Sequence, residues 1–541
     1  MVGKKCNLGN VASIRRYIGL VLSGVMLSGC VAMPGKVSYI VKDPSASSRI
    51  VATADGSVRG VVSPRGQAFL GIPFAAPPVG ELRFAPPAPV IPWHRARAAD
   101  SVGPACPQSV LLAAGNSSED CLTLNVYAPH NAGQGMVFPV MVWLYGGALA
   151  LGSNAQYDPS LLAERQGVIV VAPNYRVGAL GFLAHPALRG PGEGNYGVLD
   201  QQAALRWVKR NIAAFGGDPG NVTLFGESAG ALSACVHLLL PGSRGLFQRA
   251  ILQSDSCAQP DTSLPMAEAE AGGLMMARDL GCGDGHSALA CLRRLPAEKL
   301  YRATSHRRGN GGRDGWAPMT GGDVLPKPPD QAFAAGEGAA VPVLMGSNRD
   351  EGRLFANVKS FSFALSTRRA YEDTVASALP GDIAPVLKEY AGVAAGSYYQ
   401  AFADIVTDSH FACPILTMSR LLGGRAAFYA YEFDDPRAPM SLPRAPFTPA
   451  MGSYHAAEIA YVFQRPWALG DPNDFDLRQQ ALAGRIQHAW GTFAHTSQPA
   501  GNPAWLAFDG ARPYALSAQR TGYVEDFARR HRCAFWNARG Y

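Results

Sequence analysis

The sequence contains a Gly-x-Ser-x-Gly pentapeptide, Gly226-Glu227-Ser228-Ala229-Gly230, between a short apolar run and an Ala- and Leu-rich stretch with helical spacing. This placement predicts a nucleophile elbow, a tight strand-to-helix turn that projects the serine hydroxyl above a sheet. Small residues two positions before and after the serine allow neighbouring backbone to approach closely. The alternative interpretation is a glycine-rich turn with an exposed serine. Ser228 is therefore a candidate nucleophile that needs partners elsewhere in the chain.

A serine nucleophile needs a general base, and the oxyanion formed on attack needs hydrogen-bond donors. The segment Tyr145-Gly146-Gly147-Ala148 follows an earlier apolar run and offers small residues whose N–H groups can point inward. The N–H of Ala229, directly after Ser228, is the other expected donor. Because a Gly-Gly pair also ends strands for steric reasons alone, this segment is informative only together with the serine.

An acid and then a histidine are expected after the serine. The segment Ser347–Gly352 follows an apolar run and contains two adjacent acids, Asp350 and Glu351. Farther along, His455 lies among small residues in the segment Gly452–Glu458. The sequence has 11 histidines, and any one of them is more often a structural or surface residue than a base. Position alone therefore makes His455 a candidate and leaves both acids open.

Alternating strands and helices are expected to position these residues. Short, continuous apolar runs at 140–145 and 168–172 are typical of strands covered on both faces of a parallel sheet. Helical periodicity extends over 200–215, and 355–425 is mainly helical, which predicts a cap or side layer. The pattern predicts an α/β fold with a mostly parallel central sheet. Further apolar runs lie at 222–225, 250–252, 341–345 and 428–433.

Length and composition limit the possible fold class and number of domains. The sequence has 541 residues, of which 48% are hydrophobic and 16% are charged, so it can bury a large core and is not globally disordered. Its 60 glycines and 41 prolines are too few for a collagen-like or low-complexity chain. Because no long linker or repeat interrupts residues 48–541, we expect one large domain there.

The N-terminus has the pattern of an export signal. Four basic residues precede an 11-residue apolar stretch, Tyr17 to Leu27, which is too short to span a membrane. Leu27-Ser28-Gly29-Cys30 resembles the lipobox of bacterial lipoproteins, in which the cysteine becomes the lipidated first residue. We therefore expect a signal peptide over 1–29, lipidation at Cys30 and a tether over 30–47; the alternative is an ordinary signal with an incidental cysteine. By resemblance to lipoprotein sorting, Val31 favours the outer membrane.

The net charge of +7 does not indicate a nucleic-acid partner. Four of those charges belong to residues 1–29, which leaves +3 on the remaining chain, and no Lys or Arg run occurs elsewhere. A nucleic-acid-binding surface is normally carried by clustered basic residues. The expected attachment to a membrane is through the lipid anchor only.

Eight of the ten cysteines lie within residues 48–541, the expected domain. An even number in an oxidising compartment suggests disulfides, although buried free thiols are the alternative. Eight cysteines allow 105 pairings, so the sequence does not choose among them. No Cys-x-x-Cys or close histidine pair indicates a metal site, and none is expected.

Six segments recur in the order found in one protein family. Together they resemble the type-B carboxylesterase/lipase family, the relatives of cholinesterases and para-nitrobenzyl esterases, over about residues 50 to 535. The segments are Gly71–Pro78, Ser118–Val126, Tyr145–Ala148, Gly226–Gly230, Asp350–Gly352 and His455–Ile459.

The resemblance implies an α/β-hydrolase fold and assigns roles to the candidates. It makes Ser228 the nucleophile, Glu351 rather than Asp350 the triad acid, and His455 the general base. Backbone N–H groups of three residues would form the oxyanion hole: Gly147, Ala148 and Ala229. Ala148 stands where many members have a third glycine, which leaves the N–H in place with less room around it. Glu458 is expected to make a structural hydrogen bond.

The resemblance also implies three disulfides, Cys106–Cys121, Cys282–Cys291 and Cys413–Cys533. It offers no counterpart for Cys235 and Cys257. The 14-residue loop between Cys106 and Cys121 contains no aromatic residue, whereas cholinesterases carry a choline-binding tryptophan there and fungal lipases a large lid. The chain is therefore expected to be neither a choline esterase nor a lid-gated lipase.

The expected activity is hydrolysis of small-molecule carboxylic esters by water through an acyl-enzyme intermediate, with no cofactor or metal. A lipase acting on longer-chain acylglycerols is the alternative enzyme. A catalytically inactive binding or adhesion module is the alternative of another class, although such relatives are expected to have lost a triad residue. The natural ester and the oligomeric state are not predicted.

Overall fold

The computed structural model describes residues 40–109, 116–259, 262–283, 285, 287–304, 316–446 and 448–541. The expected signal peptide over 1–29, the expected lipidation site Cys30 and the first part of the tether, 30–39, lie outside these residues. Within the described part of the chain, no helix is both long enough and apolar enough to cross a membrane.

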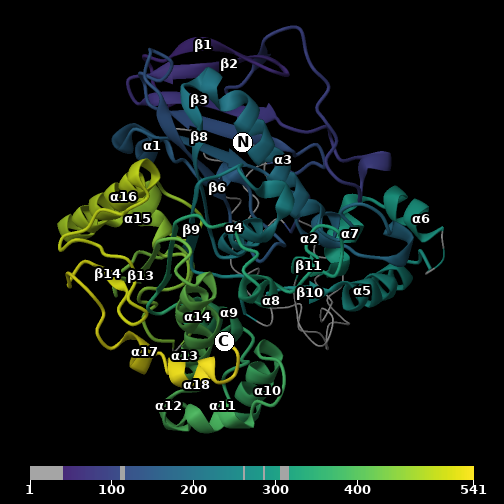
Figure 1. The fold of residues 1–541 in the computed structure, drawn as a ribbon. Helices are drawn as coiled ribbons and strands as arrows, with labels where there is room; N and C mark the ends of the chain where they lie inside the picture. The colour runs from purple at the N-terminus through teal and green to yellow at the C-terminus, as the bar shows by residue number, and fades with distance from the viewer. Residues whose placement is uncertain are drawn as a thin grey trace, which may run out of the picture.

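A large central sheet organises the molecule (Figure 1). Its strand order is β1-β2-β3-β5-β7-β6-β8-β9-β12-β13-β14, with the short β4 paired to β2. The pairs from β1 to β7 are antiparallel, and every pair from β7 to β14 is parallel. The strands are β1 Ser47–Thr53, β2 Gly56–Ser63, β3 Gly66–Pro73, β4 Arg97–Ala98, β5 Thr123–Ala128, β6 Phe138–Leu144, β7 Ile169–Pro173, β8 Gly217–Glu227, β9 Arg249–Gln253, β12 Val343–Asn348, β13 Phe428–Asp434 and β14 Tyr514–Ser517.

The parallel strands are the continuous apolar runs of the sequence. Every residue of β6, β7, β9, β12 and β13 is buried. Burial of all residues requires cover on both faces, because successive side chains of a strand point to opposite sides. In Figure 1, α1, α15 and α16 lie to the left of the central strands and α3 to the right. The predicted α/β class and mostly parallel sheet are confirmed.

Helices make up most of the remaining chain. The first group is α1 Ser160–Gln166, α2 Gly178–Phe182, α3 Tyr196–Asn211, α4 Ala229–Leu239, α5 Met266–Asp279, α6 Ala288–Arg294, α7 Ala297–Thr304 and α8 Pro329–Ala334. The second group is α9 Gly352–Ser360, α10 Arg368–Ala378, α11 Ala384–Glu389, α12 Ala391–Gly396, α13 Tyr398–Val406, α14 Cys413–Leu422, α15 Ile459–Phe463, α16 Leu477–Thr496, α17 Phe527–Arg530 and α18 Cys533–Asn537. A two-stranded parallel sheet, β10 Leu264–Pro265 and β11 Met319–Thr320, links two loops of the first group.

The stretch 355–425, expected to be helical, consists of α9 to α14. A π-helix, η8 Thr407–Ala412, joins α13 to α14. Figure 1 shows α9 to α14 gathered with α17 and α18 at one end of the molecule, away from the N-terminal strands β1 and β2. This helical layer therefore brings the C-terminal segment against the middle of the chain.

Four disulfides connect the eight cysteines that lie among the described residues. Three of them, Cys106–Cys121, Cys282–Cys291 and Cys413–Cys533, are the pairs implied by the family resemblance. The fourth joins Cys235 of α4 to Cys257, just after β9. Disulfides persist in oxidising compartments, so this set is consistent with an exported or secreted protein.

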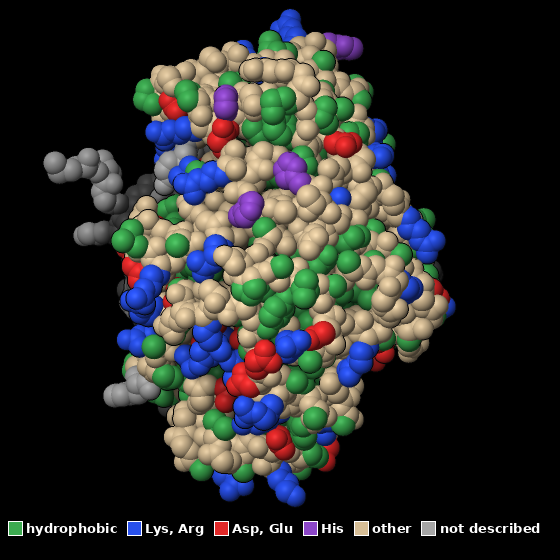
Figure 2. Space-filling view, turned by 60° about the vertical axis from the view of Figure 1, so that its left-hand side comes forward, with side chains coloured by type: hydrophobic (Ala, Val, Ile, Leu, Met, Phe, Trp, Pro, Cys, Tyr) green, Lys and Arg blue, Asp and Glu red, His purple; other side chains and the backbone are tan. Residues whose placement is uncertain are grey.

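One face of the molecule is drawn in Figure 2. Hydrophobic side chains gather across its middle, and basic and acidic side chains lie interspersed over its lower half. The charged groups seen there therefore offset one another locally instead of forming a patch of one sign.

Candidate active site

Ser228 occupies a sharp turn between β8 and α4. Its backbone has φ 55° and ψ −128°, a conformation that residues with a side chain rarely adopt. The Ser228 N–H donates to the carbonyl of Gln253 on neighbouring β9, with an N···O distance of 2.8 Å, which holds the turn against the sheet. The predicted elbow is therefore present, with the serine at the start of α4.

The glycines on either side of the elbow are required by close backbone contacts. A Cβ at Gly226 would lie 2.5 Å from the carbonyl carbon of Gly230, and a Cβ at Gly230 would lie 2.0 Å from the carbonyl oxygen of Leu144. Both distances are far below van der Waals contact. The elbow can therefore form only if these two positions lack side chains.

The Gly146–Ala148 segment follows β6 and lies beside the serine. A Cβ at Gly146 would be 3.0 Å from the Cβ of Ser228, so the two backbones approach closely. Gly147 has φ 118° and Ala148 φ 55°, so the segment turns through left-handed conformations. Ala229, on the other side, is buried in the first turn of α4. The three expected oxyanion donors thus belong to the two backbone segments that flank Ser228.

Glu351 and His455 are in direct contact. Nδ1 of His455 lies 2.7 Å from Oε2 of Glu351, which is fully buried. The other carboxylate oxygen accepts a hydrogen bond of 2.7 Å from the backbone N–H of Asn348, at the end of β12. The Nδ1–H group of His455 donates this hydrogen bond to the Glu351 carboxylate, which leaves Nε2 as the ring nitrogen without the proton.

Asp350, the neighbouring acid, faces another way. Its carboxylate lies 3.0 Å from the Arg353 guanidinium and accepts a 3.0 Å hydrogen bond from the backbone N–H of Ser453. These contacts fix the loop that carries His455. Asp350 therefore makes structural contacts, and of these two adjacent acids only Glu351 reaches the imidazole.

Glu227, inside the Gly-x-Ser-x-Gly motif, faces the other side of the imidazole. Its Oε1 lies 3.3 Å from Nε2 of His455, and no described residue donates a hydrogen bond to this buried oxygen. Ser228 is the next residue, but among the described residues no hydrogen bond joins its Oγ to Nε2. Catalytic hydrogen bonds are often long before substrate binds. Sequence reasoning gave Glu227 no role, although its place before the serine was the available signal.

Glu458 is held by side-chain amides. Its two carboxylate oxygens accept hydrogen bonds from Gln253, at 3.0 Å, and from Asn348, at 2.6 Å. The indole N–H of Trp490 in turn donates to the Gln253 amide oxygen. Glu458 therefore makes the structural hydrogen bonds expected of it, and it braces the end of the strand from which Glu351 follows.

The charges of this cluster are coupled. Burial alone lowers the pKa of His455, but the Glu227 and Glu351 carboxylates outweigh it and raise that pKa to about 9. Burial raises the pKa of Glu227 well above its usual value, and the Glu458 and Glu351 carboxylates raise it further while His455 lowers it. A proton held on Glu227 leaves His455 neutral. The two groups therefore compete for one proton, and a neutral imidazole is the form that can act as a base.

Two phenylalanines pack against the imidazole. The ring centroids of Phe355 on α9 and Phe411 on η8 lie 5.0 Å and 4.9 Å from that of His455. They keep water from one side of the ring and give the site an apolar wall. Among the described residues, no group of three or more His, Cys, Asp or Glu side chains is arranged to hold a metal ion.

Comparison with known proteins identifies the family. A model of the carboxylesterase family matches residues 47–536. An acetylcholinesterase of Bungarus fasciatus is 34% identical over 564 aligned residues, which cover 94% of this chain and 88% of the relative. A cholinesterase of Mus musculus is 33% identical over 531 residues, which cover 90% of this chain and 86% of the relative.

The elbow, the buried carboxylate–imidazole pair and the mostly parallel sheet that carries them agree with this match over nearly the whole described chain. The chain belongs to the carboxylesterase family, and it is a carboxylic-ester hydrolase with an α/β-hydrolase fold.

Proposed function

We propose that the protein is a serine carboxylesterase in which Ser228 is the nucleophile, His455 the general base and Glu351 the acid that orients it. The observation that carries this proposal is the 2.7 Å contact between His455 and Glu351, with the free Nε2 directed to the segment that contains Ser228. Nucleophile, base and orienting acid in this relation are the minimum set for acyl transfer.

The reaction proceeds in two steps. His455 Nε2 takes the proton from Ser228 as its Oγ attacks the ester carbonyl, and Glu351 stabilises the imidazolium that forms. The C–O bond of the ester then breaks, and the alcohol leaves with the proton from His455. Water, deprotonated by the same base, attacks the acyl-enzyme, which releases the carboxylic acid and restores Ser228.

The oxyanion of each tetrahedral intermediate is stabilised by the backbone N–H groups of Gly147, Ala148 and Ala229. Ala229 contributes the first N–H of α4, where the helix dipole also favours negative charge. Each such donor contributes roughly 3–4 kcal/mol to transition-state stabilisation. No cofactor takes part in this scheme.

A Ser228→Ala variant tests the nucleophile. It should lose at least about 10⁴-fold in hydrolysis of short p-nitrophenyl esters, while its thermal transition stays close to that of the unmodified protein. Replacement of an exposed serine, Ser362→Ala, is the matched control and should retain full activity. Turnover retained in Ser228→Ala would contradict the assignment.

The proposed substrates are small esters without a choline group. The relatives named above are cholinesterases, but the loop between Cys106 and Cys121 lacks the aromatic residue expected of a choline site. A series of p-nitrophenyl esters from acetate to palmitate, assayed below and above micelle formation, separates this proposal from a lipase. An esterase should favour short chains and show no jump in rate at the micelle concentration.

A serine-directed fluorophosphonate probe distinguishes the proposed esterase from the third candidate, an inactive binding module. The proposed enzyme should be labelled in its native state, and the Ser228→Ala variant should not. A native protein that is not labelled and hydrolyses no ester of the panel would favour the binding module.

The N-terminal sequence supports a proposal for location. Residues 1–29 serve as a signal peptide, Cys30 carries the lipid, 30–47 form the tether and 48–541 form the esterase domain, anchored at the outer membrane. Expression in a bacterial host with an alkynyl fatty acid should label the full-length protein but not a Cys30→Ser variant. Equal labelling of both would contradict the anchor.

A further inference from the structure

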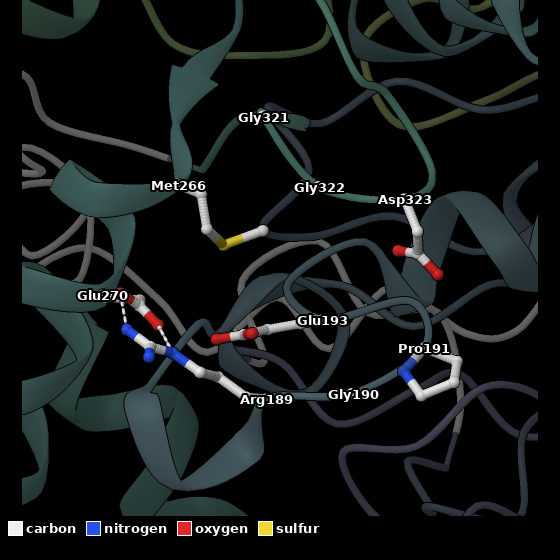
Figure 3. Close-up of a pocket in the computed structure, with 9 residues that line it drawn as sticks. All are labelled: Arg189, Gly190, Pro191, Glu193, Met266, Glu270, Gly321, Gly322 and Asp323. Carbon is white, nitrogen blue, oxygen red and sulfur yellow. Dashed lines mark hydrogen bonds and ion pairs between the residues drawn. The ribbon is translucent and has the colours of Figure 1, made fainter.

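A pocket of about 480 Å³ lies between the loop that precedes α3, the start of α5 and the loop that follows β11 (Figure 3). None of its lining residues belongs to the cluster around His455. Its lining is Arg189, Gly190, Pro191, Glu193, Met266, Glu270, Gly321, Gly322 and Asp323.

The walls of this pocket are tied together. The parallel pair β10–β11 joins the start of α5 to the Gly321–Asp323 loop. The side chain of Asn195, which precedes α3, donates to the Met319 carbonyl at 3.0 Å and accepts from the Met319 N–H at 2.8 Å. The Asp323 carboxylate accepts from the Gly192 N–H, with both oxygens 3.1 Å from the nitrogen. The cavity therefore has a preformed shape.

The pocket carries more negative than positive charge. Three carboxylates line it and only one guanidinium, that of Arg189. Arg189 makes two hydrogen bonds to Glu270, of 2.7 Å and 3.0 Å, so its charge is directed to that carboxylate. Asp323 and Glu193 have no ion-pair partner within 4 Å among the described residues. A net negative charge thus remains inside the cavity.

Glu193 is the side chain that this arrangement leaves incompletely satisfied. The residue is only 7% exposed, and its Oε1 accepts one hydrogen bond, of 3.2 Å, from the backbone N–H of His185. Its Oε2 has no partner among the described residues. In Figure 3 the Glu193 carboxylate points into the space between Met266 and the Arg189–Glu270 pair. Burial, and next the nearby Glu270, raises the pKa of Glu193, and the His185 N–H and the Arg189 guanidinium offset this rise only in part.

We propose that this pocket binds a small organic cation with a primary ammonium group, which donates hydrogen bonds to Glu193 and is drawn in by the net negative charge. A buried carboxylate is costly unless a cation or donors complete it, and an ammonium group supplies both. The alkyl part of the ligand packs on Met266, whose flexible thioether adapts to its shape.

A bare metal ion fits less well than an organic cation. No group of three or more metal-ligating side chains is found among the described residues, so the carboxylates do not converge on one point. A volume of about 480 Å³ is in the range of small-molecule sites and leaves room for a ligand body behind the charged group.

Calorimetric titration of the full chain tests the proposal with two matched probes, n-butylammonium chloride and n-butanol. The ammonium compound should bind at least about tenfold more tightly than the alcohol, because only it forms a charged hydrogen bond. Its affinity should fall when the ionic strength is raised. Equal binding of both probes, or of neither at millimolar concentration, would overturn the proposal.

The variant Glu193→Gln keeps an acceptor for the His185 N–H but removes the charge, and it should weaken butylammonium binding at least about tenfold. Asp373→Asn, which removes an exposed acid outside the pocket, is the control and should bind as the unmodified protein does. If Glu193→Gln does not fold, Asp323→Asn replaces it. Unchanged binding in the variant used would overturn the assignment.

Two further titrations separate this pocket from the esterase site and from a metal site. The same measurements in the Ser228→Ala background should give the same result, so failure of the esterase proposal and failure of this one are distinguishable. Calcium and magnesium chloride are titrated separately and in competition with butylammonium. Tight binding of a divalent ion that displaces the ammonium compound would overturn the proposal in favour of a metal site.

Discussion

His455 stands between two carboxylates of different kinds. Glu351 contacts Nδ1 at 2.7 Å and accepts a second hydrogen bond from the Asn348 N–H, whereas Glu227 faces Nε2 at 3.3 Å with an oxygen that lacks a donor among the described residues. The first contact sets the tautomer of the ring, and the second affects how readily the ring loses its proton. One histidine therefore has an orienting partner on one side and a competitor for its proton on the other.

The difference between the two adjacent acids can be measured directly. Glu351→Gln should lower kcat about 10³- to 10⁴-fold, because an amide no longer favours the tautomer with the proton on Nδ1. Asp350→Asn removes the ion pair with Arg353 and should change kcat less than about tenfold. Steady-state hydrolysis of p-nitrophenyl butyrate by both variants gives the ranking, and the reverse order would reassign the acid.

Glu227 should control the pH dependence of the reaction. The anionic carboxylate raises the pKa of His455, and the proposed general base acts as the neutral imidazole. Glu227→Gln removes that charge, so the pKa of His455 falls and the acidic limb of the kcat/KM profile should move to lower pH. A full pH–rate profile of both proteins measures this shift. A limb that stays in place, or moves to higher pH, would contradict the coupling.

Among the secondary-structure elements, the strand–elbow–helix unit formed by β8, Ser228 and α4 depends on contacts of its backbone with β6. Gly230 lies in the first turn of α4, and a Cβ there would meet the carbonyl oxygen of Leu144 at 2.0 Å. The elbow is therefore not a local feature, because the neighbouring strand decides which residues can stand in it.

A pair of glycine substitutions in helices tests this dependence. Gly230→Ala should lower the free energy of unfolding by several kcal/mol and abolish esterase activity, because α4 must move away from β6. Gly484→Ala, in the exposed part of α16 with no atom within 4 Å of the added Cβ, should raise stability by about 1 kcal/mol and leave activity intact. Thermal denaturation and activity of both variants supply the comparison. Comparable effects of the two substitutions would show that contact with β6 is unimportant.

The positions of strands and helices could be predicted from the sequence where apolar residues form a continuous or periodic run. The run 140–145 lies in β6 except for its last residue, and 168–172 lies in β7 except for its first. The helix expected over 200–215 is observed as α3 and a short 3-10 turn over 212–215. The N-terminal strands β1 and β2 were not predicted. Many of their residues are exposed or half-buried, so they lack the continuous apolar pattern that marked the central strands.

For the molecule as a whole, a buried charge network joins the C-terminus to the helical layer and the sheet. His531 contacts Asp408 of η8 at 2.7 Å through Nδ1 and Glu432 of β13 at 3.0 Å through Nε2. Arg530 makes hydrogen bonds to both oxygens of Glu432. The same π-helix carries Phe411, which packs against the imidazole of His455. The last segment of the chain thereby supports one wall of the site.

This network predicts a stability that depends on pH. Burial lowers the pKa of His531, but hydrogen bonds to Asp408 and Glu432 outweigh it and raise that pKa to about 9. A folded pKa above the unfolded value stabilises the protein fully below about pH 6.5, and this contribution is lost as the pH rises through 9.

Replacement of the histidine isolates its contribution. The difference in unfolding free energy between the unmodified protein and His531→Gln should shrink by on the order of 3 kcal/mol between pH 6.5 and pH 9.5. Urea denaturation at a series of pH values, with the disulfides kept oxidised, measures it. A difference that is constant with pH would mean that His531 is not protonated in the folded state.

The sequence by itself determined the α/β class, the elbow at Ser228 and, through its resemblance to a family, the nomination of Glu351 and His455. These features depend on local patterns and on motifs in a fixed order, both of which can be recognised in the linear sequence. Only the tertiary structure decided the Cys235–Cys257 pairing, the contact of Glu227 with His455 and the carboxylates gathered around Glu193. The physical reason is that each joins residues brought together by packing of separate elements, and spacing along the chain does not encode such distances.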